Sequence, residues 1–198
     1  MSLITKVKAG SVSSLSDARY FAGMGVDWLG FDVDTNSDSY VSPELYKSIA
    51  GWVAGPKRII EIKSLSTQDF SDLIQHYSPE GVQLPLGLIS MLPSIKLPIF
   101  ATASLHSIEI REVELIKNKI DYLLLEIGKP SQQDLAKSLL PYSKFVKILL
   151  AVTPDLRDVN DLVKNVPIAG LAFLGSKELK TGLKEYDYSE LLEQLESE

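Results

Sequence analysis

The chain has 198 residues, of which 45% are hydrophobic and 23% are charged, and its formal net charge is −6. This composition is that of a globular protein with one substantial core, and we expect a single domain over residues 1–198. Acidic and basic residues are interspersed, which argues against nucleic acid and anionic lipid as partners. We find neither an apolar run of about 20 residues nor a signal-peptide pattern, so we expect no membrane span.

Cysteine is absent from the chain, and histidine occurs only as His76 and His106. This excludes disulfides, thiolate nucleophiles and the common zinc sites, and no clustered carboxylate spacing indicates magnesium or calcium. We therefore expect no metal and no cofactor. A cytoplasmic location fits the lack of cysteine.

Short β-rich apolar runs recur along the chain at intervals of roughly 20 to 30 residues, and each is followed by turn residues and a segment of helical periodicity. This alternation is typical of parallel βα units. We expect eight strands, at residues 3–9, 28–33, 58–63, 81–84, 98–103, 122–127, 146–151 and 169–174. Helical segments are expected between them.

The start of one helix is marked by Ser42, Pro43 and Glu44, which fit an N-cap, a first helical residue and an acid favoured by the helix dipole. The first turn, at residues 10–13, lacks the glycine-rich fingerprint of nucleotide-binding open sheets. Eight units instead favour closure into an α/β fold, a compact (β/α)₈ TIM barrel with short loops. An active site in such a barrel lies at the carboxyl ends of the strands.

Glu126 is the strongest catalytic candidate, because it ends an apolar strand where a carboxyl group with a raised pKa can act as a general acid. Asp32 and Asp34 end the second strand on one face and are weaker candidates for an acid pair or cation site with Glu126. The alternative is that all three are solvated or turn-forming carboxylates.

Four further residues are considered from strand alternation and from their place in a loop or helix. Glu61 and Lys63 share one face of the third strand. His106 follows the fifth strand near a helix start, and His76 lies on a helix away from the barrel mouth. We expect His106 to be an ordinary exposed residue and His76 to be either structural or solvated.

Several segments together resemble phosphoribosylanthranilate isomerase over nearly the whole chain. The first, residues 7–10, is similar to a Lys-Ile-Cys-Gly strand end of that family, and residues 16–18 and 22–31 are similar to the helix and strand that follow it. Further matches occur in order at residues 40–44, 81–84, 121–125 and 182–184. The resemblance implies an isomerase of tryptophan biosynthesis that performs an Amadori-type proton transfer on a phosphorylated aminosugar.

The implied reaction needs a general acid and a general base across the sugar. The family's aspartate acid aligns with Glu126, and its cysteine base aligns with Ala9, which is chemically inert. This alignment places Val7 and Ala9 on the barrel interior and turns Lys8 toward the helices, unless a bulge intervenes. With another local register Lys8 would face inward, where it could stand in as the base. We accordingly expect the isomerase reaction to be disabled by the missing base.

Other family site positions also differ in this chain, where Ser39, Pro85, Val152 and Thr153 replace an arginine, a histidine and a glycine pair. Near the end of the eighth strand, Phe173 and Leu174 replace the family's two serines, while Gly175 remains; together with Ser176 it is a weak phosphate-binding candidate. The resemblance thus implies a small phosphorylated sugar as ligand and an isomerase by descent whose activity is weak, altered or lost. Two alternatives stay open: a non-catalytic binding or regulatory barrel, and a different sugar-phosphate chemistry that uses Asp32, Asp34 and Glu126.

Overall fold

The computed structural model describes residues 2–64, 70–127, 132–154, 156, 158–173, 178–180, 183–184 and 187–197. For residues 132–133, 178–180 and 183–184 it describes the backbone alone.

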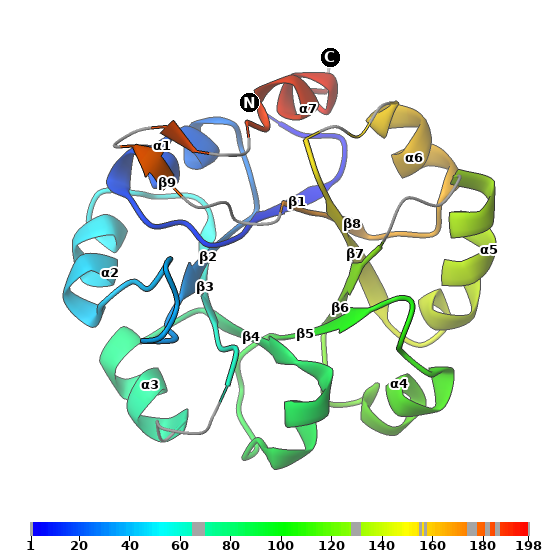
Figure 1. Cartoon of the computed structure of the whole chain (residues 1–198), viewed down its shortest axis with the longest axis horizontal. Coiled ribbons are helices and arrows are strands. Elements are labelled where there is room, and N and C mark those ends of the chain that lie inside the picture. Colours follow the sequence, from blue (N-terminus) through cyan, green and yellow to red (C-terminus); the bar gives the residue numbers. More distant parts are fainter. Residues whose placement is uncertain are drawn as a thin grey trace.

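Eight parallel strands close into a barrel, because the first strand pairs with both the second and the eighth (Figure 1). The strands are β1 (Lys6–Ala9), β2 (Trp28–Asp32), β3 (Lys57–Glu61), β4 (Gly81–Pro85), β5 (Ile99–Ser104), β6 (Tyr122–Glu126), β7 (Lys147–Val152) and β8 (Gly170–Phe173). Each overlaps one of the eight expected runs. The predicted (β/α)₈ TIM barrel is confirmed.

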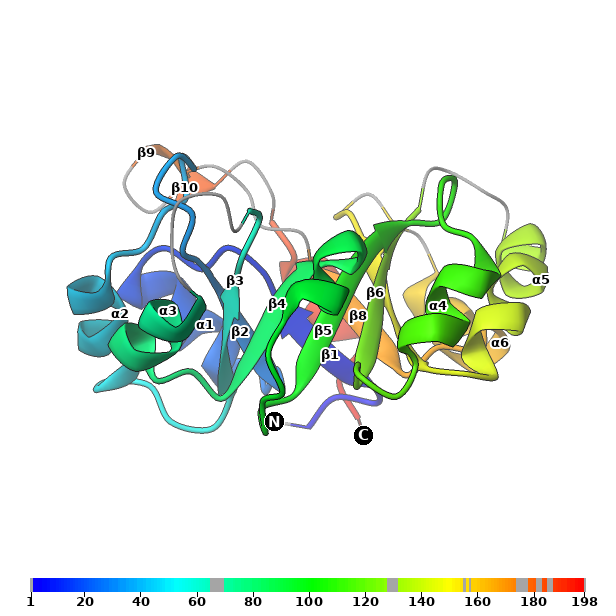
Figure 2. The same cartoon turned by 90° about the horizontal axis from the view of Figure 1, so that it is seen from below.

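Helices surround the barrel in the order of the chain (Figures 1 and 2). They are α1 (Leu15–Gly23), α2 (Pro43–Ala50), α3 (Phe70–Tyr77), α4 (Ile110–Ile116), α5 (Gln132–Ser143), α6 (Val159–Asn165) and α7 (Ser189–Gln194). A short 3₁₀ helix, η1 (Leu86–Met91), follows β4, and the antiparallel pair β9 (Glu178–Lys180) and β10 (Leu183–Lys184) precedes α7. The predicted helix start is confirmed, since the Ser42 hydroxyl accepts the Leu45 N–H at 3.3 Å.

Strand alternation sorts the apolar residues into two layers. One layer lies between the strands and the helices. The other fills the barrel interior and consists of Trp28, Ile59, Phe100, Leu124, Leu149, Ala151 and Ala172. Within the interior, Trp28 packs edge-on against Phe100 and Tyr122, which stack on each other, at the amino ends of the strands. These rings close the barrel interior at the amino ends of the strands, where charged side chains such as Lys6 and Lys147 lie over them and line a second, outer cavity.

Two buried tyrosines between β2, α2 and α3 provide a matched test of the packing. The Tyr77 hydroxyl donates to the Val41 carbonyl at 2.7 Å, whereas the Tyr46 hydroxyl is buried without a partner in the described part of the chain. We expect Tyr77→Phe to lower the free energy of unfolding by about 1 kcal/mol and Tyr46→Phe to leave it unchanged or raise it. Urea denaturation measures both, and equal losses in the two variants would contradict this assignment.

Tyr46 also makes the stability of the fold depend on pH. Burial raises the pKa of Tyr46 from 10.0 to about 12. Between these values the folded protein holds the phenolic proton more tightly than the unfolded chain, so its stability falls as the pH rises through this window. We expect Tyr46→Phe to make that decline shallower in urea denaturation at pH 9 to 11.

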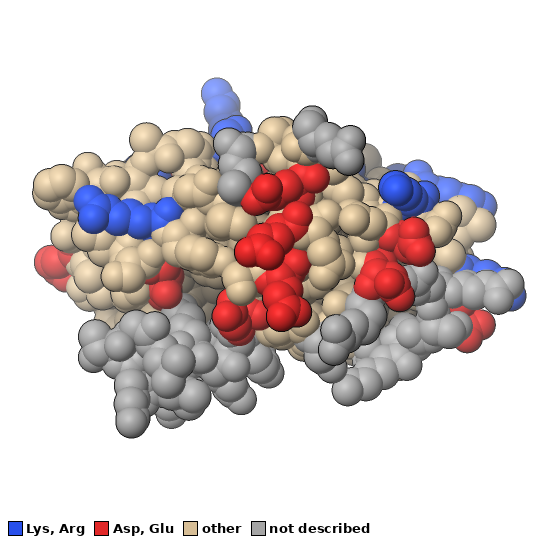
Figure 3. Space-filling view, turned by 90° about the horizontal axis from the view of Figure 1, so that it is seen from above, with Lys and Arg blue, Asp and Glu red and all other residues tan. Residues whose placement is uncertain are grey.

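The outer face of the helical layer carries acidic side chains, which gather in one region of Figure 3. On α7 and its flanks, Asp187, Glu190, Glu193 and Glu196 are all exposed and recur at every third position. Burial, together with Asp187 and Glu193, raises the pKa of Tyr20 on the neighbouring α1. No helix in the described ranges has both the length and the apolar character to cross a bilayer.

Candidate functional site

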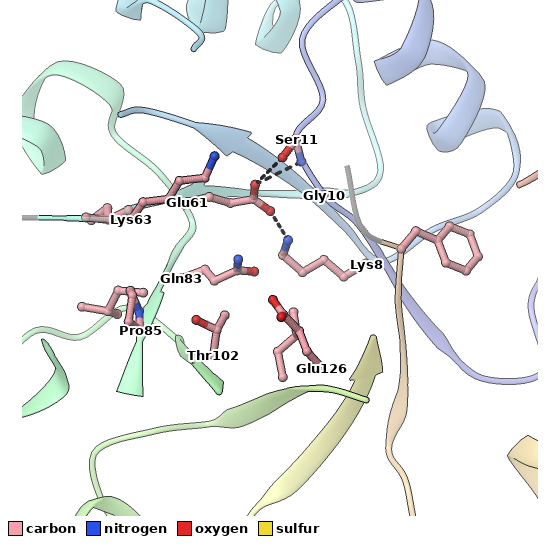
Figure 4. Close-up of a pocket in the computed structure, with 13 residues that line it drawn as sticks. Lys8, Gly10, Ser11, Glu61, Lys63, Gln83, Pro85, Thr102 and Glu126 are labelled. Atoms are coloured by element: carbon pink, nitrogen blue, oxygen red, sulfur yellow. Dashed lines mark hydrogen bonds and ion pairs between the residues drawn. The ribbon is translucent and has the colours of Figure 1, made fainter. Parts of the chain in front are cut away.

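A cavity of about 380 Å³ opens at the carboxyl ends of the strands (Figure 4). Its walls come from β1, β3, β4, β5, β6 and β8 and from the loop after β1. The polar side chains that line it are Lys8, Ser11, Glu61, Lys63, Gln83, Thr102 and Glu126. We call this space the mouth cavity. It lies where barrel folds place their active sites.

The centre of the mouth cavity is an ion pair between Lys8 of β1 and Glu61 of β3. The Lys8 ammonium contacts Glu61 Oε1 directly, and the two side chains are only 1% and 7% exposed. A buried charge is costly unless it is paired and hydrogen-bonded. Each of these two charges can therefore be buried only because the other is present.

The Glu61 carboxylate is held by Ser11 as well as by Lys8. Its Oε2 atom accepts hydrogen bonds from the Ser11 backbone N–H at 3.0 Å and from the Ser11 hydroxyl at 3.2 Å. Ser11 adopts a positive φ of 45°, which turns both donors toward the carboxylate. With three donors engaged, Glu61 is fixed in place, whereas the Lys8 ammonium has three N–H donors and uses one of them on Glu61.

The ion pair crosses over β2, and this is possible because residue 30 is glycine. A Cβ atom on Gly30 would lie 2.0 Å from Glu61 Oε1 and 2.5 Å from Lys8 Nζ. No real Cβ atom approaches so closely. The space for the pair is thus set by the absence of a side chain on the strand between its partners.

The orientation of β1 corrects one prediction made from the sequence. Lys8 lines the mouth cavity, whereas Val7 and Ala9 are fully buried in the layer between strands and helices. The expectation that Val7 and Ala9 face the interior and that Lys8 faces the helices is wrong. The reason is that Glu61 supplies the counterion, and Gly30 the room, that a lysine needs inside the barrel.

Cysteine labelling of this naturally cysteine-free chain tests that orientation. We expect the thiol of Ala9→Cys to react with an aromatic disulfide reagent on the order of 100-fold more slowly than that of Glu126→Cys, because a buried thiol reacts only when the structure opens locally. Labelling in urea serves as the control, since both thiols are then accessible. Fast labelling of native Ala9→Cys would show that β1 has the opposite orientation.

Glu126 ends β6 and lines the mouth cavity, where it is exposed. Figure 4 places its carboxylate across the cavity from Glu61, with Lys8 and Gln83 between the two. Glu61 and Lys63, predicted to share a face of β3 and its extension, both line this cavity, as expected from alternation. Among the described lining residues, Glu126 and Glu61 are the two that carry carboxyl groups.

The structure does not bring Asp32 and Asp34 into this cavity with Glu126. Asp32 is fully buried, and its Oδ2 atom accepts from the Lys63 ammonium and the Ser37 hydroxyl, each at 2.5 Å. Asp34 accepts the Asn36 backbone N–H at 3.0 Å, as a turn-forming aspartate does. Both carboxylates are thus engaged in shaping the end of β2 and the loop that follows it.

The predicted phosphate-binding residues Gly175 and Ser176 lie outside the described residues, as does Leu174. Before them, the Phe173 ring stacks on Tyr188 with 4.3 Å between centroids. Val152 is buried, and its carbonyl accepts the Tyr188 hydroxyl at 3.1 Å. The ends of β7 and β8 are therefore fastened to the segment that leads into α7.

Of the remaining candidates, all but Pro85 lie apart from the mouth cavity. His76 and His106 are both exposed, and neither lines it. Ser39 lies in the loop after β2, outside its walls, whereas Pro85 is part of them. No group of three or more histidine or carboxylate residues in the described ranges is arranged to hold a metal ion.

Besides Lys8, Ser11 and Gln83 are polar cavity residues that the sequence did not predict to be functional. Ser11 holds Glu61, and the Gln83 side-chain oxygen is buried without a hydrogen-bond donor among the described residues. Alternation along β4 places Gln83 on the same side as Gly81 and Pro85. A polar residue at this place in the strand pattern does not by itself indicate which groups its side chain contacts.

The fold is similar to that of solved phosphoribosylanthranilate isomerases. The enzyme from Thermotoga maritima has a TM-score of 0.73 and 19% identity, with 96% of this chain and 97% of that chain covered. The enzyme from Thermus thermophilus has a TM-score of 0.70 and 20% identity, with 96% of each chain covered. Another such structure contains reduced 1-(o-carboxyphenylamino)-1-deoxyribulose 5-phosphate, at a TM-score of 0.72, 19% identity and 96% and 97% coverage. The sequence matches no protein-family model and no curated protein. At these identities the similarity establishes the fold.

Proposed function

We propose that the mouth cavity is an isomerase site for a phosphorylated aminosugar, with Glu126 as the proton-transfer residue and Lys8 as the cation that stabilises negative charge on the substrate. The observation that carries this proposal is the buried Lys8–Glu61 pair facing the same cavity as Glu126. A carboxyl group and a fixed cation around one cavity are the groups that a proton shift next to a carbonyl carbon requires.

The observed orientation of β1 also changes how the family resemblance applies. With Lys8 facing inward, the Lys-Ile-Cys-Gly motif fits residues 6–9 in place of residues 7–10. Lys8 then stands where the family has its cysteine. The strand end is therefore not inert, and its chemistry is that of a cation in place of a thiolate.

In the proposed reaction one carboxyl group performs two proton transfers. Protonated Glu126 gives its proton to the ring oxygen of the sugar, and the bond from that oxygen to C1 breaks as the nitrogen lone pair forms a C1=N iminium bond. The Glu126 carboxylate then removes the proton from C2, which yields the enolamine. Transfer of the enol O–H proton to C1 completes the ketose, so atoms and charges balance.

Lys8 acts on the oxygen attached to C2, where negative charge develops as the enol becomes a ketone. Its ammonium group is oriented by Glu61, which Ser11 holds in turn. A donor fixed before the reaction begins needs no rearrangement as the charge appears. Glu61 is thus a positioning residue.

A turnover assay on N-(5′-phosphoribosyl)anthranilate tests the proposal. We expect measurable isomerisation by the native protein, and a fall in kcat/KM of about 10²- to 10⁴-fold in Glu126→Gln, the range that general acid–base groups contribute. His106→Gln is the control, because this histidine is exposed and lies outside the cavity.

Binding of reduced 1-(o-carboxyphenylamino)-1-deoxyribulose 5-phosphate, the reduced product analogue, separates the remaining outcomes. Binding without turnover favours the alternative of a non-catalytic sugar-phosphate binding barrel. If the native protein shows no turnover and no binding, the proposal is wrong.

A further inference from the structure

The acceptor oxygen of Gln83 is left without a donor inside the mouth cavity. Gln83 lies on β4 beside Glu61 of β3, and its Oε1 atom is shielded from solvent with no hydrogen bond from any described residue. A buried carbonyl oxygen without a donor is costly, and nearly all such atoms in folded proteins are paired. This atom therefore needs an explanation.

Its position distinguishes it from other unpaired atoms. The Tyr46 hydroxyl and Asn160 Oδ1 are also buried without partners in the described ranges, but neither residue lines the mouth cavity. Gln83 does line it, and Figure 4 shows its side chain next to that of Lys8. If its terminal amide turns toward the cavity, a bound molecule can supply the donor at Gln83.

Lys8 and Gln83 together present complementary groups to such a molecule. The Lys8 ammonium can only donate hydrogen bonds, and the Gln83 oxygen can only accept them. A hydroxyl group satisfies both at once, since its oxygen accepts while its hydrogen is donated. A carboxylate or a ketone satisfies only Lys8.

We infer that Gln83 is a specificity-determining residue, and that Lys8 and Gln83 jointly bind the hydroxyl group on C2 of the sugar. This inference rests on the proposed function, in which Lys8 contacts the same oxygen. The site then selects sugars that carry a hydroxyl next to the reacting carbon and discriminates against their 2-deoxy counterparts. The enol O–H donates its hydrogen bond to Gln83 Oε1 before its proton is transferred to C1.

Calorimetric titration with ribose 5-phosphate and 2-deoxyribose 5-phosphate tests the inference, because the two sugars differ only in that hydroxyl. We expect the native protein to bind ribose 5-phosphate at least about tenfold more tightly. Gln83→Met is nearly isosteric and lacks the acceptor, and we expect it to reduce the preference by about fivefold or more. Gln83→Leu provides a second variant, and thermal melting verifies that both are folded.

Asn160→Leu is the matched control, because it removes another buried, unpaired amide oxygen that lies outside the cavity. We expect it to retain the native preference. If both sugars bind the native protein and folded Gln83 variants keep the preference, or if the native protein has none, the inference fails while the sugar-phosphate site stands. If neither sugar binds and the native protein also fails to turn over N-(5′-phosphoribosyl)anthranilate, the proposed function fails and the inference with it; if only the two sugars fail to bind, the inference alone fails.

Discussion

Replacing Lys8 with methionine will lower the free energy of unfolding by about 3 to 5 kcal/mol, the cost of leaving one partner of a buried ion pair uncompensated. The Glu61 carboxylate would stay buried with only the two Ser11 donors, since its side chain is 7% exposed. Urea denaturation at neutral pH measures the loss. The same variant lacks the ammonium group that we propose contacts the C2 oxygen of the sugar, so we also expect weaker sugar-phosphate binding.

A second substitution separates stability from function at this pair. In Lys8→Met/Glu61→Leu both charges are gone, and apolar replacement of a whole buried pair is close to neutral or stabilising in other proteins. We therefore expect the double variant to regain most of the lost stability but not the binding. Lys6→Met is the control on the same strand, because the Lys6 side chain is 52% exposed and its contact with Asp27 spans 3.8 Å. Its expected effect is below about 1 kcal/mol. A Lys8→Met variant as stable as Lys6→Met would show that the pair is not buried.

Gly30→Ala is the second large effect that we expect, at about 3 kcal/mol of lost stability from overpacking and displacement of the ion pair. The added methyl group would overlap Glu61 Oε1 and crowd Lys8 Nζ, at 2.0 and 2.5 Å. Either the pair separates or β2 shifts, and both outcomes disturb the mouth cavity. We accordingly expect weaker binding of the reduced product analogue as well.

Gly23→Ala is the matched control for this substitution. A Cβ atom there meets nothing within 4 Å, and the residue is the last of α1. Alanine favours helix over glycine by up to about 1 kcal/mol, so we expect this variant to be as stable as the native protein or more so. If Gly23→Ala and Gly30→Ala lose similar amounts of stability, the effect of Gly30→Ala comes from the backbone and not from the ion pair.

The sequence by itself determined the architecture. Eight apolar runs at regular spacing predicted the eight strands, because the hydrophobic pattern and the turn residues of each βα unit mark its strand and its helix. It also placed Glu126 at the end of β6, and Glu61 and Lys63 on one face, since alternation within a single strand is a local property. All three line the mouth cavity.

Only the tertiary structure decided which face of β1 points inward. Three of its four residues are buried, because both faces of a parallel barrel strand are covered. An apolar pattern therefore does not distinguish the faces, and Lys8 alone would suggest the wrong one. Its placement depends on Glu61, 53 residues away, and on the space at Gly30. The unpaired oxygen of Gln83 could not be predicted from the sequence either, because its burial arises only when the strands around it close into a barrel.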